Sequence, residues 1–155
     1  MSSIHDLEQF ISGHPFSKGM SDEHIKLLTG CAKNVRFHEG EFLFREGGDA
    51  ETFYYIRSGK VVMELHTPPR GTIQIDSRTK DDTLGWSWMV PPYRWFCDAR
   101  AAGEVRGLAF DATCLRGKWD KDAQFAYAMY QRFVPLMHRS LQVTQLQLLD
   151  IYGKN

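Results

Sequence analysis

Hydrophobic residues recur at helical spacing in the first part of the chain. In the stretch MSDEHIKLLTGCA, Ile25, Leu28 and Cys31 fall on one face, Ser21 stands at the N-cap position, and two acidic residues occupy the first turn. The upstream stretch IHDLEQFIS predicts a shorter helix that ends at the following Gly-His-Pro. We therefore expect a helical lead-in over residues 1–33.

Short runs of β-forming residues, separated by turn residues, fill residues 34–111. The stretch NVRFHEGEFLFREGGDAETFYYIRSGKVVMELHTPPRGTIQID is broken at Glu-Gly, Gly-Gly-Asp, Ser-Gly and Pro-Pro-Arg-Gly. Strands at such close spacing favour a sandwich, a jelly roll or a small barrel. TFYYIRSGKVVMEL predicts a hairpin around a turn at Ser58-Gly59, and EVRGLAF, residues 104–110, predicts the last strand.

The pattern becomes helical from Asp120 onward. An apolar stripe at a spacing of 3.6 residues starts at Phe125 and continues to Leu148. Pro135 interrupts this stripe, and we expect a kink or a break near residues 131–134 because proline lacks the N–H and its ring clashes with the preceding turn. The stretch LQVTQLQLLDIY beyond it is apolar on more than one side, which predicts a helix that also meets a partner helix. Gly153 is the expected stop.

Together these three blocks predict one α+β domain over residues 1–155. Its centre would be an antiparallel β-roll, that is, a double-stranded β-helix or jelly roll. N-terminal helices would precede the roll, and C-terminal helices over residues 112–153, including one long helix, would follow it.

Composition and charge narrow the classes of partner. The chain has 155 residues, 43% of them hydrophobic, and 19 basic side chains balance 19 acidic ones. A domain that grips nucleic acid through its phosphates would carry a basic excess, so we expect no nucleic-acid partner. The start of the chain lacks the features of a secretion signal, and no apolar stretch approaches the roughly 18 residues of a membrane span. We expect a cytoplasmic protein with no membrane partner.

Cysteine and histidine usage argues against two kinds of chemistry. The three cysteines, Cys31, Cys97 and Cys114, are odd in number and widely scattered, which favours reduced thiols over a disulfide framework. The six histidines show no close pair of the kind that a metal-dependent jelly-roll enzyme needs. No arrangement of nucleophile, base and acid is evident either. We expect no enzyme, no metal and no cofactor.

The stretch VRFHEGEFLFREGGDAETFYYIRSGKVVMEL, residues 35–65, carries a family resemblance. A basic-aromatic strand, Gly40-Glu41, a turn at Glu46-Gly47, an aromatic strand and then Ser58-Gly59 follow one another in the order found in the opening roll of cyclic nucleotide-binding domains. The resemblance extends over residues 14–150. It implies a β-roll that holds a cyclic nucleotide such as cAMP or cGMP and signals through its long helix.

Residues 84–101, LGWSWMVPPYRWFCDARA, fall where such domains carry their phosphate-binding cassette, and we call them the cassette segment. By this resemblance Gly85 matches the turn glycine, and Arg94 matches the arginine that pairs with the cyclic phosphate. Cys97 stands at the usual threonine position. Trp86 stands where the family has a glutamate for the ribose hydroxyl, and tryptophan offers a donor but no acceptor. The segment is similar to that of a bacterial subgroup of stand-alone domains.

Each residue of this candidate site has a second interpretation. Arg94 is either a phosphate ligand or a guanidinium stacked on Tyr93, Trp95 or Trp86, with Asp98 neutralising the same strand face. The three tryptophans either fill the core, form a lid or a stacking platform for a base, or plug the nucleotide pocket. Cys97 is expected as a buried thiol, with redox sensitivity as the alternative. The candidate ligand-binding residues are Gly85, Trp86, Ser87, Trp88, Arg94, Trp95 and Cys97.

Two functional hypotheses follow. The first is a stand-alone regulatory sensor that binds a small anionic ligand, a cyclic nucleotide in a non-standard mode being one candidate, and signals through protein contacts. The alternative is a ligand-free interaction module whose pocket is filled by aromatic side chains and which forms a homodimer or docks on a partner through residues 136–152. Transcription factors of this superfamily carry a helix-turn-helix domain after the long helix. The chain ends at Asn155, so we expect a domain without one.

Overall fold

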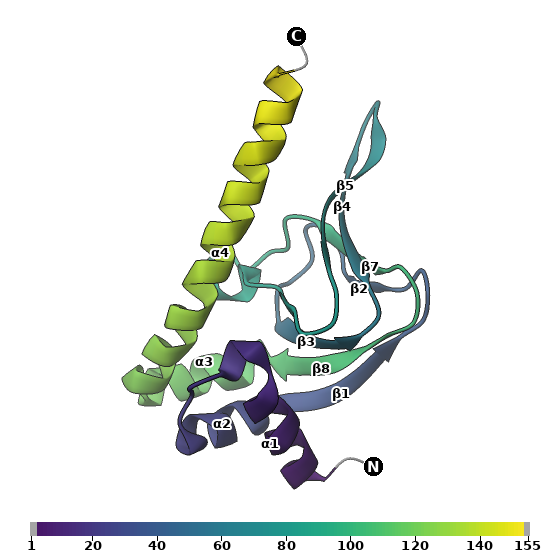
Figure 1. Ribbon diagram of the computed structural model, residues 1–155. Helices are drawn as coiled ribbons and strands as arrows, with labels where there is room; N and C mark the ends of the chain where they lie inside the picture. Colours follow the sequence, from purple (N-terminus) through teal and green to yellow (C-terminus); the bar gives the residue numbers. More distant parts are fainter. Residues whose placement is uncertain (1–2, 154–155) are drawn as a thin grey trace.

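The computed structural model describes residues 3–153 and contains two four-stranded antiparallel sheets that face each other as a β-roll (Figure 1). One sheet has the strand order β1-β8-β3-β6, and the other has the order β2-β7-β4-β5. The strands are β1 (Ala32–Phe37), β2 (Phe42–Phe44), β3 (Thr52–Ser58), β4 (Val61–Thr67), β5 (Gly71–Arg78), β6 (Thr83–Leu84), β7 (Asp98–Ala101) and β8 (Val105–Asp111). The predicted α+β class and the β-roll are confirmed.

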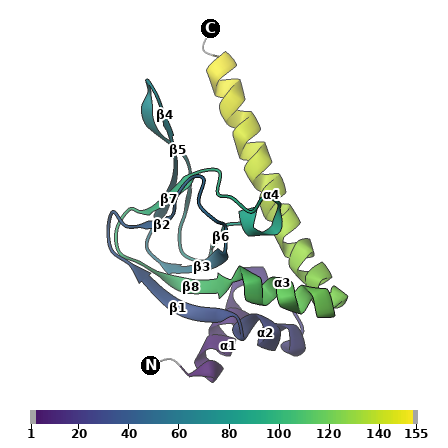
Figure 2. The ribbon, with the colours of Figure 1, turned by 180° about the vertical axis from the view of Figure 1, so that it is seen from behind.

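Helices close one end of the roll and run along its side (Figures 1 and 2). Near the start of β1 and the end of β8 lie α1 (Ile4–Gly13), the short 3-10 helix η1 (Pro15–Ser17), α2 (Asp22–Thr29) and α3 (Ala112–Lys121). The long helix α4 (Ala123–Tyr152) rises from this end past the cassette segment, toward the side on which β4 and β5 project. The predicted caps are present, because Ser21 accepts a hydrogen bond from the His24 N–H and Gly153 is the C-cap of α4.

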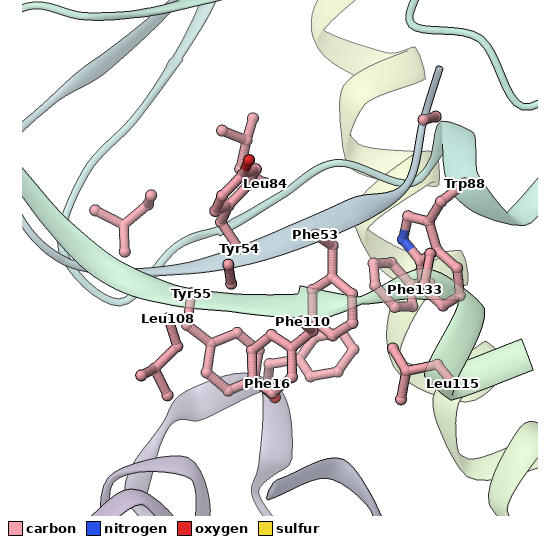
Figure 3. Close-up of a cluster of buried hydrophobic side chains, with 14 of the residues drawn as sticks. Phe16, Phe53, Tyr54, Tyr55, Leu84, Trp88, Leu108, Phe110, Leu115 and Phe133 are labelled. Atoms are coloured by element: carbon pink, nitrogen blue, oxygen red, sulfur yellow. The ribbon is translucent and has the colours of Figure 1, made fainter. Parts of the chain in front are cut away.

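A cluster of aromatic rings joins these layers in the core (Figure 3). Phe53 of β3 stacks on Phe110 of β8 with ring centroids 4.4 Å apart, and Phe133 of α4 meets Phe53 edge-on at 5.3 Å. Phe16 of η1 contacts both Phe53 and Phe133. Because rings from the lead-in, the roll and α4 share one cluster, displacement of any of these elements would disturb the packing of the others.

The predicted hairpin at Ser58-Gly59 is wrong. The two strands on either side, β3 and β4, belong to different sheets, so this turn is a corner at which the chain crosses from one sheet to the other. The hairpin instead joins β4 and β5, which pair from Thr67↔Gly71 to Val61↔Arg78. Alternation of apolar residues identifies strands but does not tell whether two consecutive strands pair with each other.

Pro135 does not break the long helix, although the sequence predicted a kink or a break near residues 131–134. α4 continues through the proline over 30 residues. Pro135 is exposed, and so is Gln131, whose carbonyl is the one that loses an N–H partner. Water can bind this carbonyl, which lowers the cost of proline inside the helix.

The expectation of three reduced thiols is also wrong for two of them. Cys31 and Cys114 form a disulfide, and Cys97 is the free cysteine among the described residues. The two partners are 83 residues apart in sequence, but the pairing of β1 with β8 brings Ala32 opposite Phe110 and so places the end of α2 beside the start of α3. Because the two cysteines lie far apart in the sequence, the sequence pattern did not indicate that they are close in space.

No helix within residues 3–153 has the combination of length and apolar character that is needed to cross a membrane.

The corner at Gly59 yields a first test of the fold. Gly59 and Gly40 both have a positive φ, +89° and +88°, which costs other residues about 1–2 kcal/mol. A Cβ atom at Gly40 would meet nothing within 4 Å, whereas one at Gly59 would overlap the carbonyl oxygen of Glu104. We expect Gly40→Ala to lower the free energy of unfolding by about 1–2 kcal/mol and Gly59→Ala to lower it considerably more. Urea denaturation measures both, and equal losses would contradict this account of the corner.

Candidate functional site

The cassette segment leaves the roll at β6, passes through the 3-10 helix η2 (Ser87–Met89) and returns as β7. This short helix is the single helical turn of the cassette segment. Gly85 has a φ of +98°, and a Cβ atom there would lie 2.9 Å from Cη2 of Trp95. Glycine is needed at this point both for the backbone conformation and for the close approach of the Trp95 ring.

Trp95 occupies the inside of the roll. Its side chain is nearly fully buried, and its ring stacks on Phe44 of β2 with centroids 3.7 Å apart and an interplanar angle of 7°. Backbone hydrogen bonds with Gly47 and Gly48 fix its position, because Trp95 N donates to the Gly48 carbonyl and Gly47 N donates to the Trp95 carbonyl. An indole ring held in this way fills space that an open pocket would leave free.

Trp88 connects the cassette segment to the aromatic core (Figure 3). It has no exposed surface, stacks on Phe53 at 5.4 Å and meets Phe133 of α4 edge-on at 5.7 Å. Its indole N–H donates to the Gly85 carbonyl at 3.2 Å, so its polar atom is satisfied within the segment. Trp88 is thus a packing residue that joins η2 to the long helix.

The other two residues at the start of η2, Trp86 and Ser87, bring no carboxylate for a ribose hydroxyl. Trp86 is half-buried against the core and makes no side-chain hydrogen bond to cap η2. Ser87 is 9% exposed, and its carbonyl accepts a hydrogen bond from Val90 N. The position at which the family has a carboxylate therefore carries an indole that packs on protein.

Arg94 faces solvent. Its side chain is 55% exposed and forms an ion pair with Asp49, with Nη1 2.6 Å from Oδ1. The predicted stack on neighbouring rings is not what the structure has, since the guanidinium over Tyr93 belongs to Arg116. The predicted neutralisation by Asp98 is wrong as well. Strand β7 begins only at Asp98, and that carboxylate instead accepts from the backbone N–H of Glu46 and lies 3.4 Å from Arg45 Nε.

Cys97 is a buried thiol, as the first interpretation of this residue expected. It has no exposed surface. Burial raises the pKa of the Cys97 thiol to about 12, and the carboxylate of Asp98 adds to this effect. The protonated thiol is a weak nucleophile, and reagents in solution do not reach it.

The structure therefore divides the predicted site residues into two groups. Gly85, Trp88, Trp95 and Cys97 come together inside the roll, with Trp86 and Ser87 packed beside them, whereas Arg94 lies outside. Arg94 and Trp95 are adjacent in sequence, but their side chains point in opposite directions. The ring of Trp95 points into the roll, and the guanidinium of Arg94 points to solvent. Sequence alone could not tell which of the two turns inward.

A cleft lies between α4 and the ends of β5 and β6, that is, between the roll and the long helix. Its volume is about 120 Å³, and Arg78, Thr83, Leu136 and Arg139 are among its lining residues. Arg78 is paired with Asp76 at 2.7 Å, and Gln147 of α4 donates to the carbonyl of Ile75 at 3.1 Å. The two walls lie far apart in sequence and carry no shared motif. Among residues 3–153, no three His, Cys, Asp or Glu side chains are arranged to hold a metal ion.

This architecture, a two-sheet roll with a short helical cassette between β6 and β7 and a long closing helix, defines a class of regulatory ligand-sensing domains. A family model described as the cyclic nucleotide-binding domain matches residues 34–122, more than half of the chain. The chain belongs to the cyclic nucleotide-binding domain family.

Solved structures share this fold at low sequence identity. A putative cyclic nucleotide-binding protein from Geobacter metallireducens is 19% identical, with a TM-score of 0.77 over 91% of this chain and 99% of that one. The regulatory domain of Toxoplasma gondii protein kinase A, crystallised with cAMP, is 14% identical, with a TM-score of 0.70 over 90% of this chain and 50% of that one. The regulatory subunit of a cAMP-independent protein kinase A from Trypanosoma brucei is 17% identical, with a TM-score of 0.68 over 90% of this chain and 47% of that one.

The opposite orientations of Arg94 and Trp95 predict opposite costs of removal. Trp95→Ala should lower the free energy of unfolding by about 3–5 kcal/mol, because it leaves a cavity against Phe44 and Gly85. Arg94→Ala removes an exposed ion pair and should cost less than about 1 kcal/mol. Urea denaturation monitored by circular dichroism measures both. A large loss for Arg94→Ala, or a small one for Trp95→Ala, would contradict the orientations described here.

Proposed function

We propose that the chain is a cytoplasmic, non-enzymatic regulatory domain that acts through protein contacts. Its cassette segment does not bind a cyclic nucleotide in the manner usual for the family. The observation that carries this proposal is the inward position of Trp95 on Phe44, next to an Arg94 that faces solvent. A cyclic phosphate needs a cation aimed into the pocket, and here Arg94 already pairs with Asp49 on the outside. The alternative form of the functional hypothesis, an aromatic-filled module, is thus the better supported one.

The free-energy cost of displacing Trp95 also opposes the binding of a nucleotide in the roll. A nucleotide entering the roll would have to displace the Trp95 ring, and the loss of such a buried ring costs about 3–5 kcal/mol. A cost near 4 kcal/mol would weaken the dissociation constant about a thousandfold relative to an open pocket. Trp86 stands where the family has a carboxylate. Its indole cannot accept a hydrogen bond from the ribose hydroxyl, so it would not offset the cost of displacing Trp95.

The exposed side of the long helix α4 supports a homodimer as the protein contact in this proposal. Apolar residues recur at alternating intervals of three and four along one side of the helix, which is the spacing of a coiled-coil seam. Most of these side chains are exposed, Val134 by 55% and Leu141 by 56%. We call this set the α4 seam; it consists of Tyr127, Tyr130, Val134, Met137, Leu141, Thr144, Leu148 and Ile151.

The surroundings of the α4 seam fit a second copy of the chain. The flanking residues Gln131, Gln145 and Gln147 are uncharged, so two identical helices would meet without repulsion between like charges. The seam extends over 3.5 heptads, about as long as a stable coiled coil requires. On its other side the same helix places Phe125, Met129 and Phe133 in the core. Changes in the core would therefore reach the dimer contact through one rigid element.

The other functional hypothesis is a sensor of a small anionic ligand, with cAMP or cGMP as candidates. It is favoured by the likeness of the fold to the Toxoplasma gondii structure with cAMP. The fold alone does not decide the matter, since the Trypanosoma brucei regulatory subunit of the same fold belongs to a cAMP-independent kinase.

Nucleotide titration separates these two hypotheses. We expect no rise in melting temperature and no calorimetric heat with cAMP, cGMP or cyclic dinucleotides up to millimolar concentration, because Arg94, the cation of the cassette segment, faces solvent and pairs with Asp49. A melting temperature that rises with nucleotide concentration would overturn the proposal. If Arg94→Ala then abolished that rise, Arg94 would be the phosphate ligand after all; if the rise persisted, another site would be responsible.

The α4 seam gives an independent test. We expect the chain to be a dimer at micromolar concentration and the double variant Leu141→Glu/Leu148→Glu to be monomeric, because two carboxylates would be buried in the seam. Leu146→Glu is the matched control, since Leu146 is 61% exposed but lies on the opposite side of the helix from the seam. Sedimentation equilibrium measures the mass of each. A monomeric wild type, or a dimer broken equally by Leu146→Glu, would refute the seam.

A further inference from the structure

The disulfide between Cys31 and Cys114 joins two helices at the closed end of the roll. Cys31 directly follows Gly30, the C-cap of α2, and Cys114 lies in the first turn of α3. Beside the bond, the backbone N–H of Asp111 donates to the Cys31 carbonyl at 2.9 Å. The end of the helical lead-in is thus covalently tied to the start of the segment that leads through α3 into α4.

The bond lies in a surface depression of about 280 Å³ whose lining includes Lys33, Thr52 and Asp111. Cys31 is 7% exposed, whereas Cys114 is half-buried, so Cys114 is the more exposed residue of the pair. The ammonium group of Lys33 would attract a thiolate anion that enters the depression. Geometry therefore allows attack on Sγ of Cys114 without prior unfolding.

We propose that the Cys31–Cys114 disulfide is a reactive site that a dithiol reductant opens and an oxidant of the disulfide class closes, and that its state determines how firmly α3 is held to α2. This inference is independent of the proposed function, because it uses neither the cassette segment nor the α4 seam.

The reaction balances as a thiol–disulfide exchange. A thiolate of the dithiol attacks Sγ of Cys114, the bond to Sγ of Cys31 breaks, and Cys31 leaves as a thiolate that takes a proton from water. The second thiol of the reductant then attacks its own sulfur in the mixed disulfide and releases Cys114. The protein gains two electrons and two protons, and the dithiol becomes a cyclic disulfide.

The position of Cys114 favours its release in the second step. The backbone N–H groups of the first turn of α3 stabilise a thiolate, as does the cation of Lys118 one turn later. Asp111, which caps the same turn by accepting from Cys114 N, offsets part of this effect. Reactivity therefore depends on exposure as well as on charge, and Cys114 has the exposure that Cys97 lacks.

Opening the bond leaves α3 attached to α2 by weaker contacts. Nζ of Lys118 donates to the carbonyl of Leu27 at 2.6 Å, and the backbone hydrogen bond from Asp111 to Cys31 remains. These non-covalent contacts can open transiently, whereas the disulfide cannot. The amide protons of α3 should therefore exchange with solvent faster in the reduced protein, while those of the core strands should not.

The test uses the full chain in its native state, incubated with reduced thioredoxin or dithiothreitol. Iodoacetamide labelling followed by mass spectrometry should label no thiol in the native oxidised protein and two, Cys31 and Cys114, after reduction in the native state. Cys97 should be labelled only upon unfolding. Hydrogen exchange over α3 should accelerate on the order of tenfold upon reduction and return to its original rate upon reoxidation. Cys31→Ala/Cys114→Ala should reproduce the reduced state, and Cys97→Ala, which removes a thiol but not the tie, should exchange over α3 as the wild type does.

Three results would overturn the proposal. A bond that resists dithiols until denaturant is added would be purely structural. Exchange over α3 that is unchanged by reduction would show that the bond does not control this helix. Two labelled thiols at positions 31 and 114 after oxidation by glutathione disulfide would show that the bond does not form. Circular dichroism shows whether a variant has lost the whole fold. If the double variant does not fold, the wild-type protein reduced in its native state takes its place in the comparison.

Discussion

The contact of Phe53 with rings from the lead-in, its own sheet, the cassette segment and α4 is the interaction on which the structure depends. Phe110 comes from the same sheet, Phe16 from the lead-in, Trp88 from the cassette segment and Phe133 from α4. Flat rings pack well only at defined distances and angles, so this cluster sets the relative positions of the elements that carry them. The cassette segment is thereby bound to the long helix through Trp88, even though its arginine faces away.

The sequence predicted the elements well and their partners poorly. Periodicity identified the lead-in, the roll and the long helix, because burial of one face leaves a local pattern. Pairing between sheets leaves no such pattern, so β3 and β4 were expected as a hairpin and Cys31 and Cys114 as separate thiols. At the candidate site, the resemblance located the cassette segment. Whether Arg94 or Trp95 turns inward depends on Phe44 and Gly85, which form the surface that receives the ring.

Membership of the cyclic nucleotide-binding domain family fixes the fold of this chain and leaves its chemistry open. The same roll is found in a kinase domain crystallised with cAMP and in a kinase subunit described as cAMP-independent. Here an indole ring has the inward position, and a regulatory role would have to rely on surfaces of the roll and of α4.

The single hydrogen bond from Gln147 to the Ile75 carbonyl has a consequence for solubility. β5 is the last strand of its sheet, and its outer edge carries backbone groups that no neighbouring strand pairs. α4 lies beside this edge and Gln147 satisfies one of its carbonyls. A free edge is a template for strand addition between molecules. The long helix thus also protects the edge of β5 from strand addition. A signal that displaced α4 from the roll would expose this edge at the same time.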